Sequence, residues 1–217
     1  MIVFGVISFL LLSYFVGAIP NGLIIGKIFR KIDIRAYGSK NTGATNAVRV
    51  LGIRLGSIAF LLDILKGVFV VSLLTFAKLD QFYLLFGGKL DIRIIYGFIA
   101  AVGHVLPIYL DFRGGKAVAT SGGAVFAIEW TIGLFGLIVF AIIVLKTKFV
   151  SLASTITSAI IVLLFILRIF FLEFFNLTIE TYLLEVGLLI GLGTIIMIRH
   201  KTNFKRLKEG KENQFTV

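Results

Sequence analysis

Five long apolar runs constrain this chain more than any other feature. They cover residues 2–29, 53–76, 92–110, 150–171 and 182–198. Each approaches or exceeds the roughly 20 residues that a helix needs to cross a bilayer. Because backbone polar groups in lipid must bond to one another, such runs form helices. The chain is 59% hydrophobic, above the level of soluble domains. The sequence therefore predicts an all-α integral membrane protein.

The segment 117–145 is also largely apolar, with a break at Glu129 and Trp130. One long span fits it, and so do two shorter helices that turn at this break, where a Trp beside an acid suits a membrane interface. Loop charge favours two helices in this segment. That gives seven transmembrane helices in all, with the N-terminus outside and the C-terminus cytoplasmic. The inner segments then hold 17 of the 22 Lys and Arg residues; they are 27–54, 111–117, 146–148 and 199–217. Six spans would separate the basic tail from the first basic loop, against the positive-inside rule.

The apolar runs leave no room for a separate soluble domain. We expect a single polytopic domain over 1–217, with a basic cytoplasmic tail at 199–217. The first run lacks the basic start of a cleaved signal peptide and is expected to be retained. The positive-inside rule explains most of the net charge of +11, so nucleic acid is not an expected partner. With no Cys and only two His, the sequence indicates no metal site and no cofactor.

Three polar, basic segments interrupt the apolar runs, all on the predicted inner side. They read GSKNTGATNAVR (38–49), GHVLPIYLDFRGGKAVATSGG (103–123) and RHKTNFKRLKEGKEN (199–213). Each places Arg or Lys beside Gly, Ser, Thr or Asn, which are the groups that hold phosphate. A phosphate site in a lipid-soluble chain predicts a membrane enzyme or carrier that handles an anionic substrate.

The first two segments carry different phosphate chemistry. Arg49 offers a planar fork that binds phosphate at two points, although a solvated loop with an ordinary helix cap would look similar. Gly114, Gly115 and Lys116 would place bare N–H groups and an ammonium at a helix start. The spacing of a nucleotide P-loop is missing there, and a positive-inside loop would carry the same charge.

The third segment and a pair of buried charges complete the candidates. His200 and Asn203 are three residues apart and can share a helix face, although helix-end capping is an alternative. The Lys and Arg residues around them are typical of lipid-headgroup anchors. Asp63 and Lys66 can form an ion pair within their span, which would fix helix packing or mark a functional site. His104, on an apolar helix, is more typical of a structural histidine.

Together the three segments resemble the bacterial acyl-phosphate:glycerol-3-phosphate acyltransferases over nearly the whole chain. The motifs GSKNTGATNAVR, GHVLPIYLDFRGGKAVAT and RHKTNFKRL stand in the family's order, with Gly210 and Glu212 after the third and an Asp63–Lys66–Gly67 element in the second span. The resemblance implies a seven-helix bundle with a cytosolic active site. It also implies acyl transfer from acyl phosphate to the 1-hydroxyl of glycerol 3-phosphate, giving lysophosphatidic acid and phosphate. This is the first acylation of phospholipid synthesis, with membrane lipids as the remaining partners.

The resemblance also implies residue roles, carried over position by position. It implies catalytic roles for Ser39, Arg49, Lys116, His200 and Asn203. It implies substrate binding by Asn41, Thr45, Asn46, Gly114, Gly115, Lys116, His200 and Asn203. Lys40 and Ala117 stand where the family usually has Gly. The residue that accepts the hydroxyl proton stays open between His200 and a phosphate oxygen of the donor; the resemblance favours the oxygen, with His200 orienting the polyol.

Two other classes of function share some of these features. A transporter or scramblase for a phosphate-bearing molecule should place polar residues along a path across the bilayer. Here only Asp63 and Lys66 lie deep. A membrane scaffold that binds acidic lipid or RNA needs positive charge alone, which gives no reason for paired glycines beside Lys116.

Overall fold

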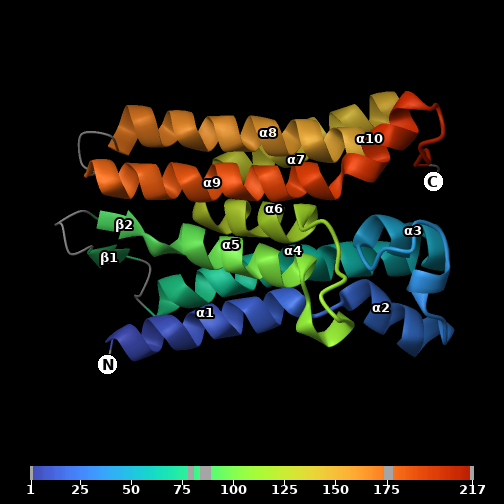
Figure 1. The fold of residues 1–217 in the computed structure, drawn as a ribbon, viewed down its shortest axis with the longest axis horizontal. Coiled ribbons are helices and arrows are strands. Elements are labelled where there is room, and N and C mark those ends of the chain that lie inside the picture. Colours follow the sequence, from blue (N-terminus) through green and yellow to red (C-terminus); the bar gives the residue numbers. More distant parts are fainter. Residues whose placement is uncertain (1, 78–80, 84–88, 174–177, 216–217) are drawn as a thin grey trace.

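The computed structural model describes residues 2–77, 81–83, 89–173 and 178–215. Apart from one short hairpin of strands, the described elements are helices, and most of them run side by side along one direction (Figure 1). In chain order the elements are α1 (Ile2–Ala18), α2 (Asn21–Ile25), η1 (Gly26–Arg30), η2 (Ile34–Ala36), α3 (Ala44–Leu51), α4 (Ile53–Phe76), β1 (Gln81–Tyr83), β2 (Lys89–Asp91), α5 (Ile92–Val105), η3 (Ile108–Leu110), α6 (Val118–Ile128), α7 (Trp130–Thr147), α8 (Val150–Arg168), η4 (Ile169–Glu173), α9 (Ile179–Arg199) and α10 (Lys201–Lys208).

Five helical stretches are long and apolar enough to cross a membrane by themselves. They are Ile53–Phe76, Ile92–Leu110, Trp130–Thr147, Val150–Phe171 and Ile179–Arg199. A sixth arises when α1 and α2, with η1, are counted as one bent span. The remaining apolar helix, α6, has 11 residues, or about 16 Å, against a hydrocarbon core of about 30 Å. The protein is therefore a multi-pass membrane protein, while the count of seven and the orientation of the termini stay predictions.

The first span is bent, although the sequence analysis treated residues 2–29 as one apolar run. The axes of its two parts differ by 46°. Pro20 lies at the break and, having no N–H, cannot continue the helical ladder. The Asn21 N–H donates to the carbonyl of Ile19, which leaves the Gly17 carbonyl without its helical donor. Lys66 Nζ, 3.2 Å away, donates to that carbonyl instead, so the broken backbone stays satisfied.

Asp63 and Lys66 form the ion pair that their spacing predicts. Nζ of Lys66 lies 2.8 Å from Oδ1 of Asp63, and the two side chains are almost fully buried. Asn21, at the break in the first span, donates to the same carboxylate oxygen at 3.0 Å. Because an unpaired charge in lipid is costly, this arrangement ties α4 firmly to the break between α1 and α2.

The segment 117–145 forms two helices that turn at Glu129, so the two-helix alternative is confirmed. Glu129 has an extended backbone (φ −144°, ψ 92°) between α6 and α7. Its carboxylate accepts hydrogen bonds from Thr131 Oγ1 (2.8 Å) and Arg168 Nε (3.2 Å). A Cβ on Gly133 would lie only 2.6 Å from the Cα of Phe126, so glycine there lets α7 fold back closely on α6.

A short antiparallel hairpin was not predicted from the sequence. In it, Gln81 of β1 pairs with Asp91 of β2. The hairpin lies at the end of the bundle opposite α3 and α10 (Figure 1). Asp91 also caps α5, accepting the backbone N–H of Arg93 at 3.1 Å. The two ends of the bundle therefore differ: one carries the hairpin, and the other carries the polar segments.

Candidate functional site

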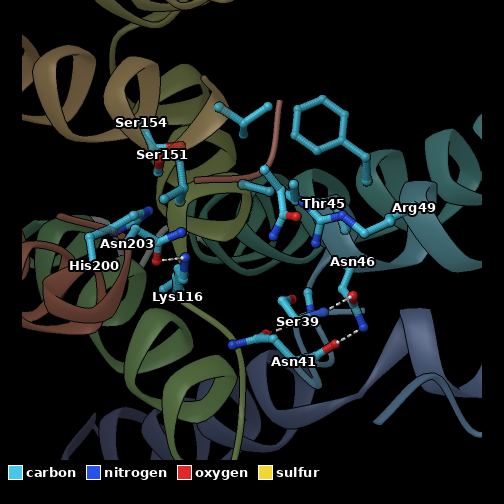
Figure 2. Close-up of a pocket in the computed structure, with 18 of the residues that line it drawn as sticks. Ser39, Asn41, Thr45, Asn46, Arg49, Lys116, Ser151, Ser154, His200 and Asn203 are labelled. Carbon is cyan, nitrogen blue, oxygen red and sulfur yellow. Dashed lines mark hydrogen bonds between the residues drawn. The ribbon is translucent and has the colours of Figure 1, made fainter. Parts of the chain in front are cut away.

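The three basic segments meet at one end of the bundle, where α3 and α10 lie (Figure 1). They line a cavity of about 100 Å³. Eight of the predicted site residues contribute to its wall: Ser39, Asn41, Thr45, Asn46, Arg49, Lys116, His200 and Asn203. Figure 2 shows Lys116, His200 and Asn203 on one side of the cavity, with Ser39 and Asn41 across from them and Arg49 reaching in from α3. Segments far apart in sequence thus form one site.

Asn46 organises the first segment. Its side chain is buried, and its Nδ2 donates to the carbonyls of Ile34 (2.9 Å) and Asn41 (2.8 Å). Its Oδ1 accepts the backbone N–H of Ser39 at 2.8 Å. Asn41 in turn accepts the N–H of Gly43 at 2.9 Å. These bonds hold Ser39 and Asn41 at the cavity, so in this structure Asn46 acts first as a positioning residue.

Gly114 and Gly115 are not brought to the cavity wall, which differs from the predicted phosphate cradle. Their N–H groups donate to the last carbonyls of α5, at 3.1 and 3.0 Å. Arg199 donates to their own carbonyls, at 2.7 and 3.1 Å. A Cβ on Gly115 would collide with the His104 ring, so glycine is needed for close packing rather than for bare N–H groups. Of the three loop residues, only Lys116 lines the cavity.

Two of the residues with left-handed backbone lie in the first segment and directly after Lys116. Lys40 has φ 59° and Ala117 has φ 62°. A non-glycine residue in that region costs roughly 1–2 kcal/mol. Glycine would form such turns without this cost, so the chain forms them here with strained residues.

Lys116 is a partly buried cation close to other cations. Its Nζ donates to Oδ1 of Asn203. Burial lowers its pKa to about 8; the Glu212 carboxylate opposes the shift, and the charges of Arg206, Arg199 and Arg49 add to it. An anion that binds beside Lys116 would relieve the repulsion among these cations, so the site is electrostatically suited to phosphate.

This pKa predicts a pH dependence. The cationic form of Lys116 is present below a pH of about 8 and is lost as the pH rises through that value. If the cation holds a substrate phosphate, kcat/KM for the acyl transfer that the resemblance implies should fall along a basic limb near pH 8. An unperturbed lysine would titrate near pH 10.4. The measurement is kcat/KM against pH at constant ionic strength. A profile that stays flat to pH 10 would contradict this assignment.

His200 is held in one tautomer. It is 2% exposed, and its Nδ1 lies 2.8 Å from the carbonyl of Ile196. Because a carbonyl only accepts, Nδ1 carries the proton and Nε2 keeps a free lone pair. Burial lowers the pKa of His200 to about 4, and the charge of Lys116 adds to the shift. The ring is therefore neutral at pH 7 and can accept a hydrogen bond from a hydroxyl group.

The cavity wall also includes residues outside the predicted site set. Ser151, Ser154 and Asn213 were not singled out from the sequence. Arg206 was interpreted as a lipid anchor, and Glu212 was noted only as following the third motif; the deeper Asp63 and His104 were interpreted first as structural residues. Glu212 accepts hydrogen bonds from Asn203 (2.6 Å), Arg206 (2.8 Å) and Ser151 (3.0 Å). Burial raises its pKa, but these bonds outweigh that effect and hold the pKa below its usual range. Small polar residues three apart at a span's first turn were the available signal for Ser151 and Ser154.

An apolar groove of about 140 Å³ continues from the cavity into the bundle. The two share four wall residues: Phe60, Val118, Ala119 and Phe140. The groove lies between α4, α6, α7, α8 and α9, and a few hydroxyls are its main polar groups. A cationic cavity joined to an apolar groove fits a molecule with an anionic head and an apolar tail. Among the described residues, no cluster of three His, Cys, Asp or Glu side chains could share a metal ion.

Comparison with known proteins gives one consistent result. A family model described as glycerol-3-phosphate acyltransferase matches residues 7–210. A protein of that name from Acholeplasma laidlawii is 40% identical over 216 residues, covering 96% of this chain and 92% of the relative. One from Fusobacterium nucleatum is 41% identical over 207 residues, covering 95% and 96%. The crystal structure of PlsY, an integral membrane glycerol 3-phosphate acyltransferase, in its glycerol 3-phosphate form matches with a TM-score of 0.80 at 30% identity, covering 98% of this chain and 96% of PlsY. The lysophosphatidic acid form of PlsY gives 0.77.

Proposed function

The chain belongs to the glycerol-3-phosphate acyltransferase family, and from this premise we propose that its acyl donor is an acyl phosphate. The acyl group passes to the 1-hydroxyl of glycerol 3-phosphate, giving lysophosphatidic acid and phosphate. The acceptor and the product are the two molecules named for the forms of the related PlsY structures. The observation that carries the proposal is the junction of a cationic cavity with an apolar groove.

Both proposed substrates carry phosphate, so the site must overcome their mutual repulsion. Arg49 and Lys116 supply the opposing charges, and Ser39 adds a neutral hydrogen-bonding group. Burial lowers the pKa of Arg49, but a guanidinium stays charged in proteins. Lys116 is partly buried and hydrogen-bonded to Asn203, so its charge stabilises an anion more strongly than it would in bulk water.

Acyl phosphate is already activated, so the reaction needs no acyl-enzyme intermediate. The 1-hydroxyl oxygen attacks the acyl carbon, a new C–O bond forms, and the bond from that carbon to the phosphate oxygen breaks. The hydroxyl proton passes to a phosphate oxygen of the donor, and phosphate leaves. Because that oxygen is a weak base, positioning must supply much of the rate. Lys116 and Arg49 stabilise the charge that develops on the leaving phosphate.

His200 and Asn203 orient the acceptor in this scheme. With Nδ1 bound to the Ile196 carbonyl, Nε2 of His200 can accept a hydrogen bond from a hydroxyl of the polyol. A base with a pKa of about 4 is poorly matched to proton abstraction at pH 7. Orientation is therefore the better role for His200 than general-base catalysis.

Replacing His200 separates these two roles. We expect His200→Ala to raise the KM for glycerol 3-phosphate about tenfold, the effect of one lost hydrogen bond in a buried site, with a smaller change in kcat. Steady-state kinetics at several pH values measure both parameters. If instead kcat alone falls and the acidic limb of the pH profile changes, His200 is the base.

The acyl chain lies in the apolar groove, and the site faces the cytoplasm. The groove begins at Val118 and Phe140, beside the cavity, so a carbonyl held near Lys116 can send its chain between the helices. The cytoplasmic side follows from the basic residues gathered at this end of the bundle and the positive-inside rule. The whole chain, 1–217, acts as one membrane domain in this proposal.

One assay tests the proposed reaction. The purified protein in lipid nanodiscs is incubated with hexadecanoyl phosphate and glycerol 3-phosphate, and in parallel with hexadecanoyl thioesters of coenzyme A and acyl carrier protein. We expect lysophosphatidic acid and phosphate in equal amounts from the acyl phosphate alone. Product formed only from a thioester would show that the donor is a thioester and that the proposed donor is wrong. No product from any donor would favour a transporter or scaffold.

A further inference from the structure

Gly122 is a helix glycine whose presence packing does not explain. A glycine inside a helix makes the helix less stable than an alanine would. In membrane helices, glycine usually permits the close approach of a neighbouring helix. Three nearby glycines follow this rule. A Cβ on Gly123 would collide with the Ile64 carbonyl, and Cβ atoms on Gly133 and Gly136 would each lie 2.6 Å from an atom of the facing helix. A Cβ on Gly122 would meet no atom within 4 Å, beyond its own helix backbone.

The open space beside Gly122 belongs to the apolar groove. Gly122 lines the groove together with Ala119, three residues before it, and Phe126, four residues after it, so these positions share one face of α6. Ala119 lies where the groove meets the cavity. Phe126 lies at the other end of α6, where it packs against Gly133 of α7. Gly122 is therefore about 5 Å beyond the mouth of the groove.

We propose that Gly122 determines acyl-chain specificity: the missing side chain keeps the groove open, and the residue size at this position sets how long an acyl chain the enzyme accepts. The proposal rests on the proposed function, because it takes the groove as the acyl-chain site. A short acyl chain ends near the mouth and does not pass Gly122. A long chain must pass it, so only long-chain donors should respond to a larger residue there.

The first test compares donors of two lengths. For Gly122→Leu we expect kcat/KM with hexadecanoyl phosphate to fall at least about tenfold, since a pocket that loses room for a few methylenes discriminates to that extent. With hexanoyl phosphate the change should stay within about threefold. Gly187→Leu is the matched control, because Gly187 of α9 is also free of neighbours within 4 Å but does not line the groove. Equal losses with both donors, no loss, or the same loss in Gly187→Leu would overturn the proposal.

A milder variant separates groove filling from misfolding. Gly122→Ala should raise the melting temperature, because alanine is the better helix residue and its Cβ meets no neighbour, while still lowering the preference for the long donor. Gly123→Ala should lower the melting temperature, because its Cβ meets backbone atoms of α4. A fall in stability in Gly122→Ala would contradict the inference that the space beside it is open.

A binding measurement makes the test independent of the donor chemistry. Hexadecyl phosphate and hexyl phosphate are titrated into wild type and Gly122→Leu in nanodiscs. We expect the variant to lose at least about tenfold in affinity for the long probe and to keep its affinity for the short one. If wild type fails to use acyl phosphate, the proposed donor is wrong, and this titration still decides the role of Gly122. Unchanged affinity for hexadecyl phosphate would overturn that role.

Discussion

Lys116→Met should lower kcat/KM for acyl transfer by about a thousandfold without unfolding the protein. Methionine keeps the length and apolar stem of lysine but removes the charge. Removal of one group that stabilises developing charge typically costs a factor of 10² to 10³, and Lys116 is the cavity cation that hydrogen-bonds Asn203. Its loss also leaves the Glu212 carboxylate with less opposing charge next to an incoming phosphate.

The matched control is Lys201→Met, which removes a lysine that is exposed and does not line the cavity. It should change kcat/KM by less than about twofold. The basic limb near pH 8 should also disappear in Lys116→Met, because that limb belongs to the Lys116 ammonium. Residual activity that still declines through pH 8 would show that another group titrates there.

Arg49→Lys should lower kcat/KM by about a hundredfold, although the positive charge is kept. Among the residues that the structure describes, the Arg49 guanidinium has no hydrogen-bond partner, and it reaches into the cavity (Figure 2). A planar fork that grips phosphate at two points cannot be replaced by a single ammonium. Losing one hydrogen bond to a charged group costs roughly 1.5–3 kcal/mol, which corresponds to a factor of about 10 to 150.

The comparison variant for Arg49 is Arg54→Lys. Arg54 lies in the first turn of α4, is exposed and does not line the cavity. It should retain nearly full activity in the same assay. If both variants lose activity to the same extent, the loss comes from general positive charge at the membrane surface, and the role assigned to Arg49 is wrong.

The sequence predicted those parts of the fold that depend on local chemistry. The apolar runs gave the long helices, the spacing of Asp63 and Lys66 gave their ion pair, and Glu129 beside Trp130 gave the turn between α6 and α7. The bend at Pro20 was within reach of the same reasoning, because proline interrupts a helical ladder. The hydrogen bond from Lys66 to the freed carbonyl of Gly17 depends on how the helices pack, and spacing along the chain does not predict that packing.

The site was predictable in composition but not in geometry. Residue types indicated that Arg49 and Lys116 hold phosphate, and the resemblance added His200; the structure brings all three to one cavity. The N–H groups of Gly114 and Gly115 bond to the last carbonyls of α5. This was not predictable, because it depends on where α5 ends in space. The groove glycine had no signal in the sequence either. Its neighbour Gly123 has the same residue type and the opposite environment.

We propose that the three distant segments form one site on the cytoplasmic side of the membrane. The chain has no cysteine, so single-cysteine variants need no altered background. Suitable positions are exposed, lie outside the proposed machinery and sample each segment once. They are Lys40→Cys, Arg113→Cys and Lys201→Cys, with Trp130→Cys at the turn between α6 and α7.

Labelling of intact cells with a membrane-impermeant maleimide, before and after permeabilisation, tests this claim most directly. We expect the first three variants to be labelled only after permeabilisation and Trp130→Cys to be labelled in intact cells. Labelling of any one of the three segment variants in intact cells, with the other two protected, would place the segments on opposite sides of the membrane and contradict the shared site.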